Sequence, residues 1–320
     1  MQWQPWSGEW YIDGGVLVLA LALDLAFREP PARLHPVVWI GGAISALDKW
    51  LPQSSPKKAL TSGSFMAVCL PLVAGGLAWL AMLGLKEIGS LAYLIGGAVL
   101  LKTAFAVKGL AQAAQATEDA MEAERLDDAR GSLQSLVSRD AQGLAPPLVA
   151  AAAVESVAEN TTDSYIGPWL AFALLGLPGA FAYRALNTLD SMVGYRGRYE
   201  YFGKASAKMD DLVNLIPARI SAGLVLLAGS LEGLSARRGW NEMIKAKRKT
   251  ASPNAGWTIG AMSGLLGVVL EKPGQYRIGD GYREPDASDI GASVRLAYLV
   301  AALGVSLAIG VIYLRAALVA

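Results

Sequence analysis

The stretch "GSFMAVCLPLVAGGLAWLAMLGL", residues 63–85, runs for 23 residues without a charged side chain. A helix that crosses a bilayer needs about 20 consecutive, mostly apolar residues, so this stretch predicts a transmembrane helix. Residues 88–107 and 292–314 have the same character, and their single charged side chains are Lys102 and Arg295. Both lie near an end of their stretch, where a long stem can carry the charge to water. We expect three complete spans here.

The composition of the whole chain agrees with a membrane protein. Of its 320 residues, 53% are hydrophobic and 17% are charged, and the mean hydropathy is +0.37. A soluble domain carries about 25% charged residues, so the apolar surplus predicts that the chain faces membrane lipid. The formal net charge of +1 argues against nucleic acid as a partner, because contacts with phosphates demand a basic excess.

Three further apolar stretches are short or interrupted. Residues 16–27 contain Asp24, residues 166–183 contain several prolines and glycines, and residues 212–231 contain Pro217. Such interruptions predict broken or re-entrant helices, which are tolerated where the backbone is shielded by protein or water. Asp24 is the only clear acid that we expect within a span.

Together these patterns predict an all-α, multi-pass integral membrane protein with about five transmembrane helices. We expect no β-sheet, because long runs of strand periodicity are missing. Residues 1–320 are predicted to form a single membrane-embedded domain. Within it we expect a surface helical insertion at residues 108–165, whose acidic side is most simply a solvated face, and a polar loop region at residues 233–291.

The basic residues follow three of the apolar stretches. They lie after Phe27, Val107 and Leu231, and an excess of Lys and Arg marks cytoplasmic loops. We therefore expect a helical polar layer on the cytoplasmic side. The stretch from Arg184 to Asp211 is also basic, and the topology of residues 166–231 stays open.

One polar stretch, "VESVAENTTDSYIGPWLAF" at residues 154–172, carries acids at regular spacing. Glu155, Glu159 and Asp163 recur every four residues, and at about 100° per residue they would fall on one stripe of a helix. Like charges at that spacing repel. The pattern therefore indicates a cation, a basic partner or solvent that relieves the repulsion.

Four other polar clusters flank the apolar stretches. They are "EPPARLHPVVWIGG" at residues 29–42, "SRD" at 138–140, a long stretch at 183–220, and "SPNAGWTIGAMSGLLGVVLEKPGQY" at 252–276. The long stretch combines carboxylates and amides with Arg and Lys, which are the groups that bind Mg²⁺ and phosphate. The alternative is a set of ion pairs that anchor lipid headgroups.

The last cluster carries small residues at helical spacing. These are Gly256, Gly260, Gly264 and Gly267. A helix with such a face can be approached closely by another backbone or by a flat ligand. The sequence leaves both interpretations open.

Six motifs together resemble a known family. "HPVVWIG", "SRD", "ESVAENTTDS", "NTLDSMVGYR", "DDLVNLIPARI" and "SPNAG", in this order and at these spacings, closely resemble those of the cobinamide-phosphate synthases of adenosylcobalamin biosynthesis. The resemblance runs from about Asp24 to the last span. One departure is that Arg28, Glu29 and Pro30 stand where the family often has Gly-Asp-Pro, which leaves the role of an acid there open.

The resemblance implies a multi-pass enzyme of the cell inner membrane whose active site lies on the cytoplasmic side. Such an enzyme joins adenosylcobyric acid, a corrinoid substrate, to aminopropanol phosphate or aminopropanol through an amide bond, with ATP and Mg²⁺. Other late cobalamin-assembly enzymes are expected partners. A carboxylate accepts an amine only after its oxygen becomes a leaving group, so the reaction requires phosphate binding, charge stabilisation and a base.

Residue chemistry and motif position select the candidate site residues. The catalytic candidates are Glu155, Glu159, Asp163 and Asp190, of which Glu159, Asp163 and Asp190 are also the metal candidates. The substrate-binding candidates are His35, Arg139, Asn160, Arg184, Asn187, Arg196, Lys204, Asp210, Asp211, Asn214 and Asn254. We expect the three acids at residues 155–163 to meet residues 187–190 around one cavity, because Mg²⁺ and phosphates need ligands from more than one element.

Two other functions stay open. A prenyl- or alcohol-phosphate transferase also sets Asn and Asp around Mg²⁺ and diphosphate, but repeated Asp-rich motifs in both halves would favour it and none repeats here. A non-enzymatic membrane sensor or transporter is the third possibility, since a signalling protein linked to β-lactamase induction is distantly similar to the same family. For that class we would expect acids buried within spans.

Overall fold

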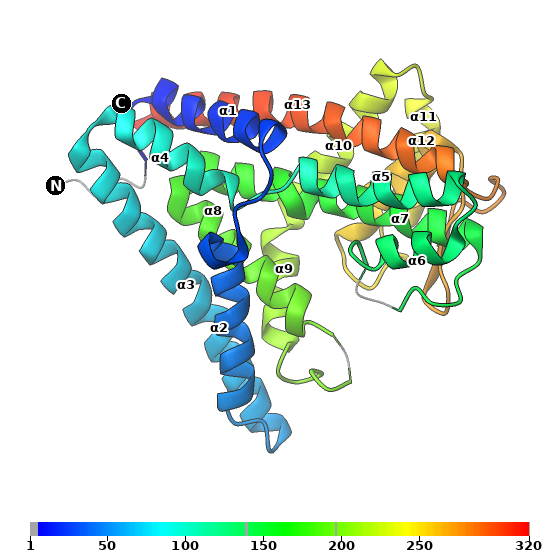
Figure 1. The fold of residues 1–320 in the computed structure, drawn as a ribbon, viewed down its shortest axis with the longest axis horizontal. Coiled ribbons are helices and arrows are strands. Elements are labelled where there is room, and N and C mark those ends of the chain that lie inside the picture. Colours follow the sequence, from blue (N-terminus) through cyan, green and yellow to red (C-terminus); the bar gives the residue numbers. More distant parts are fainter. Residues whose placement is uncertain (1–5, 138–139, 196, 320) are drawn as a thin grey trace. The chain divides into compact units, whose positions relative to one another are not determined.

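The computed structural model describes residues 6–137, 140–195 and 197–319 (Figure 1). The described chain is mostly helical. Its helical elements are α1 (Trp10–Ala26), η1 (Ala32–Leu34), α2 (Pro36–Trp50), α3 (Pro56–Ile88), α4 (Ser90–Lys102), α5 (Lys108–Glu122), α6 (Leu126–Leu133), α7 (Pro146–Thr161), η2 (Thr162–Ile166), α8 (Gly167–Val193), α9 (Lys204–Val213), α10 (Leu215–Leu231), α11 (Ala236–Ala246), α12 (Ala255–Leu266) and α13 (Ala287–Val319). Two short strands, β1 (Leu270–Lys272) and β2 (Tyr276–Ile278), complete the fold.

The chain divides into two compact units. Unit 1 comprises Met1–Ala106, Gly167–Val213 and Val305–Ala320, and unit 2 comprises Val107–Ile166 and Asn214–Gly304. The stretches predicted as a surface insertion and as a polar loop region both fall in unit 2. The second of these contains α11, α12 and the two strands, so it has more regular structure than a loop. That the whole chain acts as one membrane-embedded domain stays a prediction.

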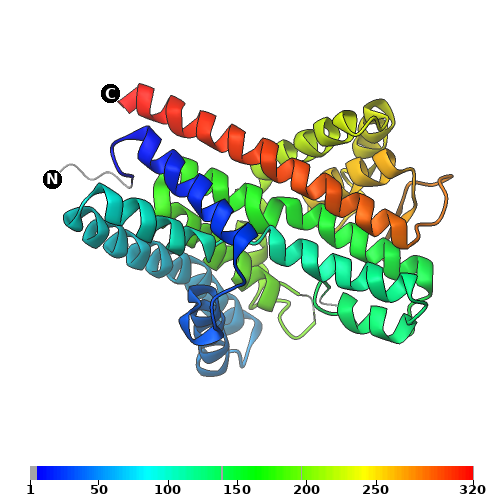
Figure 2. The same ribbon diagram turned by 45° about the horizontal axis from the view of Figure 1, so that its top comes forward.

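Unit 1 is built on helix packing around α3. This helix packs against α8, and α1 packs against α4 (Figures 1 and 2). Ile44, Met66, Leu189 and Phe202 belong to one buried apolar cluster. A Cβ on Gly63 would lie 1.7 Å from the carbonyl oxygen of Phe202, so only glycine permits this approach of the backbones.

Within the described residues, three helices are long and apolar enough to cross a membrane. They are Pro56–Ile88, Pro146–Val193 and Ala287–Leu318, and α9 with α10 passes the same test as a bent pair. The all-α, multi-pass prediction is confirmed, as are the spans predicted at residues 63–85 and 292–314. The predicted irregularity of residues 166–183 is also confirmed, because Gly176 inside α8 has a φ of 63° and a ψ of −158°.

The complete span predicted at residues 88–107 is wrong. Gly89, with a φ of 138°, ends α3, and α4 has only 13 residues. Such a helix is about 20 Å long, against roughly 30 Å of hydrocarbon. Lys102 does not carry its charge to water either, because its side chain is 7% exposed and its Nζ lies 3.1 Å from Glu29 Oε2.

Unit 2 is organised around α12, which packs against α7, α10 and α11. The predicted surface insertion is helical, and both α5 and α6 pack against α7 (Figure 1). Its acidic side is not uniformly solvated. Partial burial raises the pKa of Glu118, and the neighbouring charges of Glu122 and Asp119 raise it further.

A small antiparallel hairpin contradicts the prediction that no β-sheet is present. Leu270 pairs with Ile278 and Lys272 with Tyr276. Strands of three residues are too short to show a period of two in the sequence. The signal that the sequence did contain is the Pro273–Gly274 turn, in which Gly274 has a φ of 74°.

The glycine face of α12 is covered by the backbone of α11. A Cβ on Gly256 would lie 2.5 Å from the carbonyl oxygen of Ala246, and one on Gly264 would lie 2.6 Å from the carbonyl oxygen of Arg238. On Gly260, a Cβ would lie 2.6 Å from the Cβ of Ala246. Helix packing is therefore the correct interpretation at these three positions, and a flat ligand has no room there.

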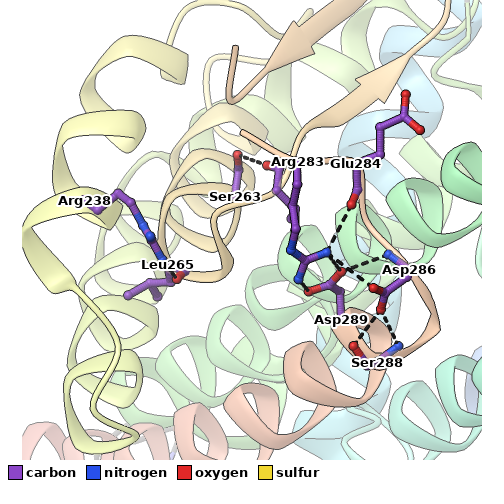
Figure 3. Close-up of polar contacts among 9 residues, drawn as sticks. Arg238, Ser263, Leu265, Arg283, Glu284, Asp286, Ser288 and Asp289 are labelled. Atoms are coloured by element: carbon purple, nitrogen blue, oxygen red, sulfur yellow. Dashed lines mark hydrogen bonds and ion pairs between the residues drawn. The ribbon is translucent and has the colours of Figure 1, made fainter. Parts of the chain in front are cut away.

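Arginine side chains secure the two ends of the segment that follows α12 (Figure 3). Arg238 donates hydrogen bonds of 2.6 Å each to the carbonyl oxygens of Gly264 and Leu265, at the C-terminal end of α12. Arg283 makes a two-point contact with the buried carboxylate of Asp289 in the first turn of α13, at 2.8 and 2.7 Å. These contacts fix the hairpin segment between α12 and α13.

Candidate functional site

Two acids of the predicted stripe lie one turn apart in α7. Glu155 is 6% exposed and Glu159 is half-buried. Asp163 belongs instead to η2, a π-helical turn from Thr162 to Ile166. A π-turn rotates less per residue than the 100° of an α-helix, so the stripe predicted from α-helical spacing does not continue unchanged to Asp163; such turns occur frequently at functional sites.

Asn160 bridges α7 and the π-helical turn. Its Nδ2 donates to the carbonyl oxygen of Ser156 at 2.9 Å and to the hydroxyl of Ser156 at 3.1 Å, and its Oδ1 accepts from Ser164 at 3.0 Å. The Ser156 hydroxyl in turn donates to the carbonyl oxygen of Leu136 at 2.8 Å. These bonds hold the helix in shape beside Glu159. Substrate binding by Asn160 stays a prediction.

The candidates in α8 gather toward its C-terminal end. Arg184 Nη1 donates to Asn187 Oδ1 at 3.3 Å. Asp190 follows one turn later, and a Cβ on Gly194 would lie 2.0 Å from Asp190 Oδ1. The Asp190 carboxylate therefore lies over Gly194, the residue after the helix, in space that a Cβ at position 194 would fill.

The candidates in α9 lie at its two ends. Lys204 begins the helix and is exposed, whereas Asp210 is 8% exposed and Asp211 is half-buried in its last turn. Six residues of helix separate Lys204 from Asp210 by about 9 Å along the axis. In unit 2, Asn214 precedes α10 and is also buried.

His35 lies in a cluster of charged side chains with Glu29 and Lys102. Of the three, only His35 was selected as a site residue from the sequence. Its Nε2 is 3.2 Å from Glu29 Oε2, which also accepts a hydrogen bond from Lys102 at 3.1 Å. Burial acts to raise the pKa of Glu29, but the hydrogen bonds from His35 and Lys102 outweigh it and lower this pKa below its usual value. The acid at the position that departs from the family pattern thus binds two basic side chains.

Asn254 lies beside a basic cavity of about 410 Å³ in unit 2. Arg219, Lys247 and Arg248 line this cavity, and Arg219 Nη1 donates to Asn254 Oδ1 at 2.7 Å. Sequence reasoning selected Asn254 but not Lys247 or Arg248. The signal that could have found them is the basic run "KAKRK", residues 245–249, directly before the last polar cluster.

Asp24 is not the only buried acid in an apolar helix, contrary to the prediction. Asp13, in the first turn of α1, is 1% exposed. Its carboxylate accepts hydrogen bonds from the Tyr93 hydroxyl and the Ser7 amide, at 3.1 Å each, and pairs with Arg315 of α13. The acid is buried because three donors replace its water.

Two candidates, Arg139 and Arg196, lie outside the described residues. Within the described ranges, no group of three or more His, Cys, Asp and Glu side chains is arranged to hold a metal ion. Mg²⁺ usually takes only one or two protein carboxylates together with phosphate oxygens and water. The assignment of Glu159, Asp163 and Asp190 as metal ligands therefore stays a prediction.

Comparison with known proteins finds similarity over most of the chain. The family model described as CobD/Cbib protein matches residues 17–305. The cobalamin biosynthesis protein CobD of Dehalococcoides mccartyi is 39% identical over 298 residues, which cover 93% of this chain and 97% of the relative. The protein of the same name from Geobacter metallireducens is 41% identical, with 89% and 92% covered.

An archaeal relative shows similar coverage. The probable cobalamin biosynthesis protein CobD of Methanothermobacter thermautotrophicus is 37% identical over 92% of this chain and 98% of its own length. No solved structure matches the chain.

Proposed function

Because this chain belongs to the CobD/Cbib family of cobalamin biosynthesis proteins, we propose that it is an amide-forming ligase. The substrates are adenosylcobyric acid and aminopropanol phosphate or aminopropanol, with ATP as the co-substrate. The reaction takes place at the cytoplasmic side of the cell inner membrane. Other late enzymes of cobalamin assembly consume the product.

The observation that carries the proposal is the acidic face that runs from α7 into the π-helical turn. Glu155 is nearly inaccessible, whereas Glu159 and Asp163 are half-buried and reachable from solvent. A carboxylate in that setting can accept the proton of the incoming ammonium group, which must become a neutral amine before it attacks. Glu159 is our first choice for this base.

The carboxylate of the corrinoid must also be activated: its oxygen attacks the γ-phosphate of ATP and releases ADP, and the amine then displaces inorganic phosphate from the acyl phosphate. The donor set of Glu159 and Asp163 fits Mg²⁺, which takes oxygen ligands and one or two carboxylates. When bound, the ion would offset charge between the two anions. Asp190, Arg184 and Asn187 on α8 carry groups of the same chemistry, and we assign the remaining polar candidates to orienting the substrates.

The test of this assignment is Glu159→Gln, which removes the negative charge and keeps the side-chain shape. Turnover should fall by roughly 100-fold or more, the scale for losing a general base or a main charge-stabilising group. The matched control is Glu232→Gln, at an exposed acid after α10, which should keep wild-type turnover. Normal turnover in Glu159→Gln, with an unchanged or higher melting temperature, would mean that the acidic face is structural.

A further inference from the structure

The basic cavity in unit 2 is formed by α10, the end of α11, the loop before α12 and the first turn of α12. Its lining includes Arg219, Lys247, Arg248, Thr250, Ser252 and Trp257. Among the described residues that line it, every charged side chain is a cation. The neighbouring Lys249 is not part of this lining and pairs with Asp280, whose carboxylate oxygen lies 3.2 Å from its Nζ. The cavity therefore has a positive potential that selects an anionic ligand.

Two of the three cations, Arg219 and Lys247, are positioned by contacts within the cavity. The guanidinium carbon of Arg219 lies 4.8 Å from the ring centre of Trp257, and Lys247 Nζ lies 5.4 Å from the same ring. Arg219 also donates to Asn254 Oδ1 at 2.7 Å and to the carbonyl oxygen of Leu215 at 2.8 Å. Positioning of this kind lowers the entropy that a ligand must overcome to bind.

The loop that closes the cavity is rigid as well. The Thr250 hydroxyl donates to the carbonyl oxygen of Ser252 at 2.7 Å and accepts from the Gly256 amide at 3.1 Å. The Ser252 hydroxyl accepts from the Asn254 amide at 3.2 Å. The "SPNAG" motif thus forms a fixed wall beside the three cations.

We propose that this cavity binds the phosphate group of aminopropanol phosphate, an inference that rests on the proposed ligase function. Phosphate oxygens accept charge-assisted hydrogen bonds from guanidinium and ammonium groups. A phosphate monoester carries about −1.5 to −2 charges at pH 7, which three cations balance without a metal ion. A cavity of about 410 Å³ also lies within the range for small-molecule sites.

The charges argue against a Mg²⁺–nucleotide as the occupant. That complex brings a divalent cation, which proteins usually bind with one or two carboxylates in addition to the phosphates. Among the described lining residues there is no carboxylate, and three positive charges surround the space. The cavity selects the phosphorylated amino-alcohol, and ATP binds elsewhere.

The experiment measures binding rather than turnover. The full chain, in nanodiscs of phosphatidylcholine, is titrated calorimetrically with aminopropanol phosphate, aminopropanol, inorganic phosphate and Mg-ATP. Lys247→Gln and Arg248→Gln each remove one lining cation, and Arg237→Gln removes an exposed charge of α11 outside the cavity. A charge-assisted hydrogen bond typically contributes about 1.5–3 kcal/mol. Each lining variant should therefore lower the affinity for aminopropanol phosphate by roughly 10- to 100-fold.

The control Arg237→Gln should bind like wild type, and aminopropanol without phosphate should bind at least tenfold more weakly than its phosphate. Arg248 is exposed, so Arg248→Gln is expected to melt like wild type and keeps the test decisive if Lys247→Gln is unstable. Unchanged binding of aminopropanol phosphate in Arg248→Gln overturns the proposal. Weaker binding of Mg-ATP by the lining variants, in place of weaker binding of aminopropanol phosphate, also overturns it.

A lipid headgroup carries the same phosphate chemistry, and a further arm separates it. In nanodiscs with added phosphatidylglycerol, a headgroup site would bind lipid and block aminopropanol phosphate in wild type but not in the variants, which also overturns the proposal. Failure of the ligase function has a different signature: the chain would bind aminopropanol phosphate as expected and still form no amide.

Discussion

The buried pair of Asp13 and Arg315 should contribute strongly to the stability of unit 1. The two residues are 302 positions apart, and they join α13 to α1. Their side chains are 1% and 9% exposed. The perturbations are Asp13→Asn, Arg315→Gln and the double variant.

The expected magnitude follows from burial. Removing one partner leaves the other charge buried and uncompensated, which typically costs about 3–5 kcal/mol. For Arg315→Gln the stranded group is Asp13, which keeps the hydrogen bonds from the Tyr93 hydroxyl and the Ser7 amide. The double variant strands no charge, so it should cost less than the sum of the single variants by roughly 2 kcal/mol or more.

A surface pair provides the matched control. Arg125 and Asp128 have the same chemistry at 2.8 Å, but their side chains are 61% and 59% exposed. Breaking that pair should cost about 0.5 kcal/mol or less. The paired chemical groups are therefore the same while burial changes.

The assay is unfolding by SDS in mixed micelles, followed by tryptophan fluorescence. Trp6 lies 4.5 Å from the Arg315 guanidinium, so its emission also reports locally on the pair. If Arg315→Gln costs no more than breaking the surface pair, or if the two single costs simply add, the reasoning from burial is refuted.

Three further predictions concern other parts of the chain. Gly194→Ala places a methyl group 2.0 Å from Asp190 Oδ1 and should lower the rate of amide formation at least tenfold if Asp190 is catalytic; Gly131→Ala, which meets nothing within 4 Å, should leave the rate unchanged. Gly260→Leu should cost at least 1–3 kcal/mol in the free energy of unfolding, because α11 fills that space, whereas Gly223→Leu, where a Cβ meets no atom within 4 Å, should cost much less; equal costs would contradict the packing. The folded pKa of Glu29 is lower than its unfolded pKa, so its contribution to stability is present above the unfolded pKa and is lost as pH falls through the folded pKa. On acidification below about pH 4.5, the melting temperature of wild type should therefore fall further than that of Glu29→Gln. The difference should correspond to less than about 1 kcal/mol in the free energy of unfolding, because Glu29 is 41% exposed. Equal falls in melting temperature would contradict this.

The membrane spans were predictable where apolar length decides them. Residues 63–85 lie within α3 because no charge interrupts the stretch. Residues 88–107 misled the same reasoning, because hydropathy does not register that Gly89 adopts a positive φ or that Lys102 finds a partner in Glu29. The pairing joins residues 73 positions apart, which no local pattern can show.

The candidate site was predictable in its residue types and less so in its geometry. Periodicity placed Glu155 and Glu159 on one helix, but the π-helical turn that contains Asp163 depends on packing that a sequence does not display. The basic cavity was missed because Arg219 and Lys247 come from separate segments whose side chains both lie near the Trp257 ring. Asp13 was missed because its partner lies near the other end of the chain.

The most direct measurement of the central claim is amide formation by the purified chain. Protein in nanodiscs is incubated with adenosylcobyric acid, aminopropanol phosphate, Mg²⁺ and ATP, and the corrinoid is analysed by mass spectrometry. We expect a product heavier than the corrinoid acid by the mass of aminopropanol phosphate less one water, formed only when ATP is present and abolished in Glu159→Gln. No amide with any amino-alcohol, from protein that melts cooperatively and binds its substrates, would contradict the assignment of this chain as the ligase.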